Sequence, residues 1–398
     1  MSRHKHLAAV ATATLLVLST AGCGSVTSQA RPRIAPPLPP PPGLATSLVT
    51  PGGTWAVAVL GGSAAQDNNF WQLFVRPARS ARWRLATPPG VASNGGLVLA
   101  SLGGQSLIAG FRPSQDLVFS PLASSSDNGT NWSGGVLDAG LADVPDALAA
   151  APGSGRLLAL LADGEIEQAR RGATAWSRLT SMHSLATAPA GSRCSPDAAT
   201  AVSFTPSGAA LAAVICTRPG VAGIFSYAAG TGQGAGTGQG GGTWRAAGPA
   251  MPAQLAGRQV QVLRLTRTPA GEVALLAARS GRSADLLAAW TSDGTHWTIS
   301  APLILGTGTV RAAGFSAAGA AWVLTASGQA DTIAAKTARW RPLPRLPAAT
   351  AALAFGPAGG IDALAARGSR LTDWRLTGSS AWTKVQTLDV PVQYGSSS

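Results

Sequence analysis

Titratable side chains are scarce in this 398-residue chain, and their types limit the chemistry that it can perform. Asp and Glu together number 17, and there are only four histidines. His183 and His296 are the histidines beyond the first 23 residues. They are remote from each other and belong to no set of cysteines or carboxylates at zinc-ligand spacing. No GxGxxG motif follows a strand and opens a helix. The sequence therefore predicts no metal and no cofactor.

Basic residues outnumber acidic ones, with 30 Lys and Arg and a formal net charge of +13. The arginines are scattered along the chain rather than gathered with aromatic residues on one stretch, so nucleic acid is not expected as a partner. Attraction to anionic lipid headgroups or wall polymers is the more plausible use of this charge.

The N-terminal segment carries an export signal. Arg3 and Lys5 precede an apolar run from Leu7 to Leu18, which is too short to span a bilayer and is followed by Ala21-Gly22-Cys23. This segment resembles a bacterial lipoprotein leader. The resemblance implies that residues 1–22 are removed, that Cys23 is lipidated, and that the chain is anchored to the outer face of the cytoplasmic membrane. The alternative is an ordinary secretory signal, and in either case the mature chain is exported.

A proline-rich stretch follows the leader. Residues 23–43 include the runs Pro36-Pro37 and Pro39 to Pro42, which cannot form a sheet ladder and favour extended polyproline II. We expect a spacer here, followed by a folded domain that covers residues 44–398.

Two further cysteines, Cys194 and Cys216, remain once Cys23 is assigned to the lipid. They form an even pair in a compartment where disulfides persist, and they flank a turn at Gly208. If the chain folds back there, two strand-borne cysteines come within bridging distance. The alternative is a pair of buried free thiols.

Tryptophans recur along the chain and indicate its architecture. Most of their intervals lie between about 42 and 53 residues, the size of one four-stranded propeller blade, and a Gly-bearing turn precedes each tryptophan. The recurring tryptophans are Trp83, Trp132, Trp176, Trp244, Trp297, Trp340 and Trp382. The sequence therefore predicts an all-β fold, a seven-bladed β-propeller of four-stranded antiparallel blades, with almost no helix.

The third repeat shows the predicted strands most clearly. We expect strands over residues 147–151, 156–161, 165–170 and 176–179, with turns between them. The longest interval, 68 residues before Trp244, contains a low-complexity Gly-rich insert at residues 228–243. We expect this insert to be a loop between the third and fourth strands of its blade.

Two of the repeats carry a recognisable turn motif. Ser125-x-Asp127-x-Gly129-x-x-Trp132 matches the Asp-box pattern, and Thr291-x-Asp293-Gly294-x-x-Trp297 is one residue shorter. The chain thus resembles the sialidase-like, or BNR-repeat, propellers. In that family the boxes are structural and lie on the side away from the active site. The resemblance therefore implies that Ser125, Asp127, Gly129, Trp132, Thr291, Asp293, Gly294 and Trp297 form turns rather than catalyse.

A sialidase similar to that family would need an arginine triad, a Tyr nucleophile with a Glu base, and an Asp acid. The chain has three Glu and two Tyr. Glu165 and Glu167 alternate along one expected strand and look solvent-facing, while Glu272 follows a turn on the expected structural face. We assign no catalytic residue.

Arginines gather in the expected connections between second and third strands, on the face opposite the boxes. These are Arg112, Arg218, Arg279, Arg282, Arg367 and Arg370. Guanidinium groups suit carboxylate or phosphate, so this face is a candidate anion-binding surface. The alternative is that exposed hairpins are simply filled with arginine.

These observations favour a non-enzymatic cell-surface lipoprotein that binds an unknown protein, or a glycan or anionic wall polymer. The alternatives are a sialidase-like glycan hydrolase, which rests on family resemblance alone, and an assembly factor for a membrane complex.

Overall fold

The computed structural model describes residues 45–61, 69–91, 96–113, 121–134, 141, 143–151, 153–170, 176–228, 242–356, 359–377 and 381–391. All of them belong to the second of two compact units, Pro37–Ser398. The segments predicted as a leader and a proline-rich spacer, and the predicted lipidation site Cys23, lie outside the described residues, and so does most of the Gly-rich insert.

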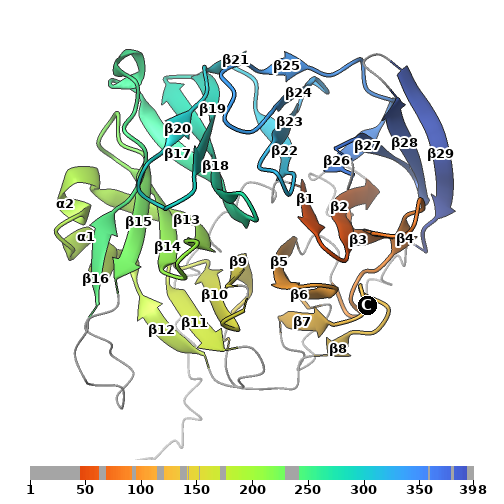
Figure 1. Cartoon of the computed structure of the whole chain (residues 1–398), viewed down its shortest axis with the longest axis horizontal. Coiled ribbons are helices and arrows are strands. Elements are labelled where there is room, and N and C mark those ends of the chain that lie inside the picture. Colours follow the sequence, from red (N-terminus) through yellow and green to blue (C-terminus); the bar gives the residue numbers. More distant parts are fainter. Residues whose placement is uncertain are drawn as a thin grey trace, which may run out of the picture. The chain divides into compact units, whose positions relative to one another are not determined.

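Strands make up nearly all of the regular structure, and they follow one another as four-stranded antiparallel meanders (Figure 1). The first three meanders are β1 (Ala45–Thr50), β2 (Gly53–Gly61), β3 (Asn69–Pro77), β4 (Arg84–Leu85); β5 (Leu97–Gly103), β6 (Ser106–Phe111), β7 (Leu122–Ser125), β8 (Ser133–Gly134); and β9 (Pro145–Ala151), β10 (Arg156–Leu161), β11 (Ile166–Arg170), β12 (Ser177–Thr180). The fourth and fifth are β13 (Pro196–Phe204), β14 (Ala210–Cys216), β15 (Gly223–Ala228), β16 (Thr243–Ala246); and β17 (Gln259–Thr268), β18 (Gly271–Ser280), β19 (Ser283–Thr291), β20 (Thr298–Ile299), with β21 (Leu303–Gly306) also paired to β19. The sixth and seventh are β22 (Val310–Phe315), β23 (Ala321–Thr325), β24 (Ala330–Ile333), β25 (Arg341–Pro342); and β26 (Thr350–Phe355), β27 (Ile361–Arg367), β28 (Arg370–Thr377), β29 (Ala381–Asp389).

The strands predicted for the third repeat are confirmed to within two residues at each end. Each recurring tryptophan lies at or just before the fourth strand of its meander, and each Gly-bearing turn lies between the first two strands. The insert falls between β15 and β16, as expected from the long interval. These features were predictable because each turn is determined by a few adjacent residues and similar turn residues recur in every meander.

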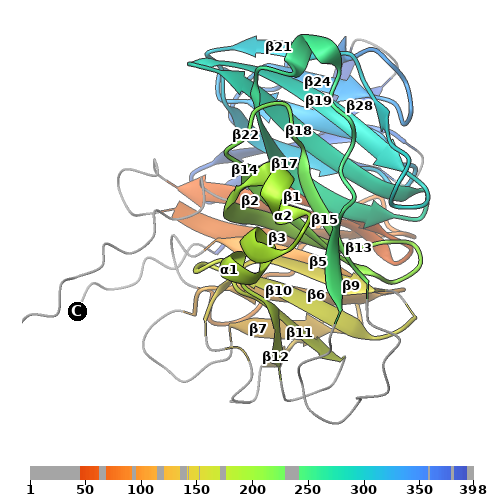
Figure 2. The ribbon, with the colours of Figure 1, turned by 90° about the vertical axis from the view of Figure 1, so that its left-hand side faces the viewer.

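Helices are few in the described chain, as predicted. Two short helices, α1 (Met182–Thr187) and α2 (Gly191–Cys194), precede the fourth meander and lie on its outer side (Figure 2), and η2 (Ala253–Leu255) precedes the fifth. Ser181 caps α1 by accepting a hydrogen bond from the backbone N–H of Ser184. None of the described helices has the length and apolar character needed to cross a bilayer.

Cys194 and Cys216 form a disulfide, which confirms the predicted pairing. The two cysteines do not both lie on strands, however. Cys194 ends α2 and Cys216 ends β14, so the bridge ties the helical segment onto the sheet. Both residues are buried in the core cluster that the third and fourth meanders share.

Removing this disulfide is expected to destabilise the protein. Closing a loop of this length restricts the unfolded chain, so the double variant Cys194→Ala/Cys216→Ala should lose about 3 kcal/mol of unfolding free energy. Urea denaturation under oxidising conditions measures the loss. Under reducing conditions the difference between parent and variant should shrink, and an equal difference in both conditions would contradict the assignment to the bond.

The meanders pack in a cycle through their apolar faces. Six core clusters each combine two meanders that are neighbours in sequence, and a seventh combines the first meander with the last. In Figure 1 the first strands β1, β5, β9, β13 and β17 face the centre. The second strand of each meander is covered on both faces by neighbouring meanders. Its sequence is therefore nearly continuous Ala, Val and Leu, as in β14 and β18.

Antiparallel meanders alternate their connections between two faces. We call the turn face the one that carries the turns between first and second strands and between third and fourth strands. The loop face carries the remaining connections. Neighbouring turns touch on the turn face: Gly52 donates to the carbonyl of Gly104 at 3.0 Å, and Arg156 Nη1 donates to the carbonyl of Gly208 at 2.8 Å.

One pairing had no signal in the sequence. β1 pairs with β22 in parallel, with Ala45 opposite Ala312 and Ser47 opposite Gly314, which joins the first and sixth meanders into one eight-stranded sheet. A Cβ at Gly314 would lie 2.5 Å from Ser47 Oγ, so glycine permits this close approach.

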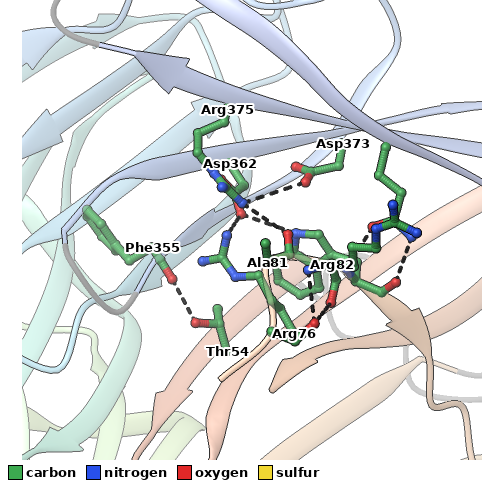
Figure 3. A network of polar contacts seen from close by, with 11 residues as sticks. Thr54, Arg76, Ala81, Arg82, Phe355, Asp362, Asp373 and Arg375 are labelled. Carbon is green, nitrogen blue, oxygen red and sulfur yellow. Dashed lines mark hydrogen bonds and ion pairs between the residues drawn. The ribbon is translucent and has the colours of Figure 1, made fainter. Parts of the chain in front are cut away.

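A buried ionic network joins the first meander to the seventh (Figure 3). The carboxylate of Asp362 on β27 accepts hydrogen bonds from Arg76 on β3, from Trp83 Nε1 at 3.1 Å, and from Arg375 Nε on β28 at 3.0 Å. Arg76 and Asp362 are only 3% and 1% exposed. Nearby Asp373 is fully buried, and burial together with the charge of Asp362 raises its pKa to about 7.

Candidate functional site

The first Asp box, residues 125–132, is a closed hydrogen-bonded turn. Ser125 Oγ donates to Asp127 Oδ1 at 2.8 Å and accepts from the backbone N–H of Gly129 at 2.7 Å. Asp127 Oδ1 also accepts from the N–H groups of Thr130 and Asn131, at 3.0 and 2.9 Å. Gly129 has φ +76°, which explains glycine at this position.

The second box, residues 291–297, repeats this geometry with Thr291 in place of serine. Thr291 Oγ1 donates to Asp293 Oδ1 at 2.9 Å, and that oxygen accepts from the N–H of Thr295 and of His296 at 2.8 Å each. Hydrogen bonds to the ionised carboxylates lower the pKa of both aspartates, that of Asp127 to about 2. Such carboxylates hold the turn and are poor proton donors.

Each box tryptophan also ties its meander to the one before. Trp132 Nε1 donates to the carbonyl of Ala86, which follows β4, and Trp297 Nε1 donates to the carbonyl of Ala247, which follows β16. The two distances are 3.0 and 2.6 Å. The boxes therefore lie on the turn face and stabilise contacts between meanders.

All six candidate anion-binding arginines are exposed and lie on the loop face, at the junction of second and third strands, but only two of them share a groove. Arg112 follows β6, Arg218 follows β14, and Arg279 and Arg282 flank the β18–β19 turn. Arg367 and Arg370 flank the β27–β28 turn and line a groove of about 510 Å³.

This groove, here called the basic groove, is built by the seventh meander and the segment that leads into it. Its lining comprises Arg345, Leu346, Pro347 and Ala348 from the β25–β26 connection, Ala365 and Arg367 from β27, Arg370, Thr372 and Trp374 from β28, and Trp382 and Lys384 from β29. The cation side chains alternate with apolar ones because each strand presents every second residue to the groove.

Positive charge dominates the basic groove. Arg370 Nε pairs with Asp389 Oδ1 at 3.1 Å, with both side chains largely exposed. Among the described residues, Arg345, Arg367 and Lys384 have no carboxylate partner. The two indoles of Trp374 and Trp382 supply flat apolar walls, and the buried Trp382 Nε1 has no hydrogen-bond acceptor in the described structure.

A second hollow of about 660 Å³ continues the groove toward the sixth meander. It shares Arg345 to Ala348 and adds Arg311 and the β23–β24 turn at 327–329. Burial lowers the pKa of Arg311, whose guanidinium donates to the carbonyl of Thr350. An elongated ligand could thus lie across both hollows.

Sequence reasoning missed Arg345, Lys384 and the two tryptophans of this groove. Arg345 lies in a connection between meanders, and Lys384 lies on the outermost strand, so neither belongs to the second-to-third-strand connections that were considered. The one local indication of this part of the groove was the proline-flanked sequence Pro344-Arg345-Leu346-Pro347, because prolines keep an irregular connection extended.

The carboxylates that a sialidase would need are not gathered around a common opening. Glu165 pairs with Arg178 at 3.0 Å. Glu272 is fully buried and accepts a hydrogen bond from Ser203 Oγ at 2.8 Å, and burial raises its pKa to about 8. The expectation for Glu272 was incomplete: it does follow a turn, but it points into the interface with the fourth meander. Tyr227 packs on Trp244, with ring centroids 5.2 Å apart, and Tyr394 lies outside the described residues.

Within the described ranges no three His, Cys, Asp or Glu side chains form a group that could hold a metal ion.

No protein-family model matches the chain, and no curated protein matches it. Solved structures do. A periplasmic gluconolactonase of Pseudomonas aeruginosa is 17% identical with a TM-score of 0.52, and the match covers 84% of this chain and 96% of that one. A Lactobacillus plantarum protein is 13% identical with a TM-score of 0.50, covering 84% and 95%. YCF48 from Cyanidioschyzon merolae is 16% identical with a TM-score of 0.47, covering 82% and 94%.

The two likenesses with TM-scores of 0.52 and 0.50 establish the architecture, a β-propeller, and confirm that part of the prediction. Identities this low concern the fold alone, since propellers host many unrelated activities.

Proposed function

We propose that this chain is a non-enzymatic, exported scaffold whose basic groove binds an anionic glycan or wall polymer. The observation that carries the proposal is the groove itself: four cations and two indoles line one continuous surface, and one of the cations, Arg370, pairs with a carboxylate. Guanidinium groups suit carboxylates and phosphates, and flat aromatic walls suit the apolar faces of sugar rings.

The proposal includes the place and shape of the molecule. The seven meanders are the seven blades of one ring, supported by the seven core clusters that join successive meanders and return from the last to the first. The ring is held outside the cytoplasmic membrane by lipid on Cys23 and the proline-rich spacer. A polymer of the cell wall would be within reach of such a tether.

The groove is tested by polygalacturonate, an anionic polysaccharide, with methyl-esterified pectin as the uncharged polymer of the same backbone. In a binding assay, the parent protein should bind polygalacturonate and should not bind the methyl-esterified pectin. Arg367→Ala/Arg370→Ala should weaken retention at least about tenfold, because two charged hydrogen-bond donors are removed.

Arg279→Ala/Arg282→Ala is the matched control. This pair flanks the equivalent turn of the fifth meander, is equally exposed, and lies outside the groove. Equal losses for the two double variants would reduce the effect to overall charge and overturn the proposal. Turnover of a fluorogenic glycoside panel would favour the hydrolase instead, and stoichiometric recovery of a membrane complex would favour the assembly factor.

A further inference from the structure

A third hollow lies at the centre of the ring and is distinct from the basic groove and its 660 Å³ continuation. It has a volume of about 540 Å³, within the range of small-molecule sites. Its walls are the C-terminal halves of β1, β5, β9, β13 and β17, and the turns that follow β1, β13 and β17 form its rim. It therefore lies toward the turn face, whereas the basic groove runs from the loop face along the outer strands of the seventh meander. We call it the central cavity.

The walls of the central cavity are mostly apolar or hydroxyl-bearing, but two arginines of β17 line it. Arg267 is held in place: its Nη1 donates to the carbonyl of Thr205 at 3.1 Å and its Nη2 to that of Pro206 at 3.3 Å. Arg264 is different. In the described structure it has neither a hydrogen-bond acceptor nor a carboxylate partner for its guanidinium.

A bulge in β17 directs Arg264 toward the cavity. Val260 and Val262 point into the core shared with the fourth meander, and unbroken alternation would send residue 264 there as well. The register against β18 shifts between Val262 and Arg264, so that Leu265 takes the next place in that core. One extra residue thus keeps the arginine out of the apolar interface and on the cavity wall.

The environment of Arg264 is costly for a cation. Arg264 is partly exposed to the cavity, and desolvation by the surrounding protein lowers its pKa to about 10. A partly desolvated guanidinium without a protein acceptor is available to pair with a bound anion.

We infer that the central cavity binds a small organic carboxylate whose apolar body lies against Leu48, Val49 and Leu99 and whose carboxylate pairs with Arg264. The planar fork of the guanidinium matches the two oxygens of a carboxylate. This site does not depend on the basic groove, so either proposal can fail without the other.

Octanoate and octanamide, which differ in charge and hardly in shape, are the probes. Calorimetric titration of the parent should show octanoate binding at least about tenfold more tightly than the amide. Equal affinities, or no binding of octanoate, would overturn the inference without any variant. Inorganic phosphate distinguishes a general anion site, and tighter binding of phosphate than of octanoate would also contradict the proposed ligand class.

Arg264→Met should lose octanoate binding at least about tenfold. Without octanoate it should melt at a slightly higher temperature than the parent, because an unpaired and partly desolvated charge is removed. A merely structural arginine would give the opposite shift in melting temperature. Arg279→Met, on the exposed end of β18, is the control and should leave both readouts unchanged. Unchanged octanoate affinity in Arg264→Met would overturn the assignment, and Arg264→Lys, which keeps the charge, should retain part of the binding.

Discussion

Replacing Asp362 with alanine is expected to lower the unfolding free energy by about 3–5 kcal/mol, because it leaves buried cations without their partner. Asp362 accepts from Arg76, Trp83 and Arg375 at once, and Arg76 is almost fully buried. Burial already lowers the pKa of Arg76, so the loss of Asp362 removes the stronger of the two carboxylates, Asp362 and Asp373, that favour its charged form. The network joins the first and last meanders, and its loss should loosen the closure of the ring.

Asp389→Ala provides the comparison for this experiment. Asp389 pairs with Arg370 in the same meander, but both side chains are largely exposed, so its removal should cost less than about 1 kcal/mol. Denaturant unfolding of the parent and the two variants measures the two losses of unfolding free energy. A loss for Asp362→Ala as small as that for Asp389→Ala would mean that the ionic network does not hold the closure. Combining Asp362→Leu with Arg76→Met should recover much of the loss, since buried pairs can be replaced by well-packed apolar groups.

Replacing Glu272 with glutamine is expected to remove a pH dependence of stability. The folded protein holds the Glu272 proton more tightly than the unfolded chain does, because burial raises the pKa from 4.5 to about 8. The contribution of this proton to the unfolding free energy is therefore complete below about pH 4.5 and is lost as the pH rises to about 8. Glutamine has no proton to lose and can still accept the hydrogen bond from Ser203.

Glu272→Gln should thus be more stable than the parent at pH 9, by at most about 5 kcal/mol, and nearly equal to it at pH 4.5. Urea titrations at pH 4.5, 7 and 9 measure the difference. Asp373, with its pKa raised to about 7, contributes a similar slope to both proteins, so only the difference between them isolates Glu272. Glu165→Gln is the control, because Glu165 pairs with Arg178 near the surface. Parallel pH profiles for parent and Glu272→Gln would contradict the prediction.

The propeller architecture was predictable because its signals are local. A Gly-bearing turn, an Asp box or a tryptophan at the start of an outer strand each acts over fewer than ten residues, and the chain repeats them. The disulfide was predictable for a similar reason, since one turn brings its cysteines together. The location of Cys194 on α2 was not, because a four-residue helix has no periodicity to detect.

The functional surfaces were less accessible from the sequence because distant segments build them. Arg76 and Asp362 are 286 positions apart, and no local pattern pairs them. Arg367 and Arg370 could be placed on the loop face from topology alone, but Arg345 and Lys384 join them only once the seventh meander folds against its leading segment. Arg264 looked like any strand residue, since only the bulge decides whether it enters the core or the cavity.

The parallel pairing of β1 with β22 sets an order of events in biosynthesis. β1 cannot form this pairing until β22 has been synthesised, because Ala45 pairs with Ala312. At roughly 5–20 residues per second, the ribosome makes β22 tens of seconds after β1. Throughout that delay the nascent chain presents a free strand edge, the kind of template that recruits other chains. Folding of the ring therefore completes only after synthesis has passed the sixth meander, and a chaperone that shields this edge would raise the yield of soluble protein.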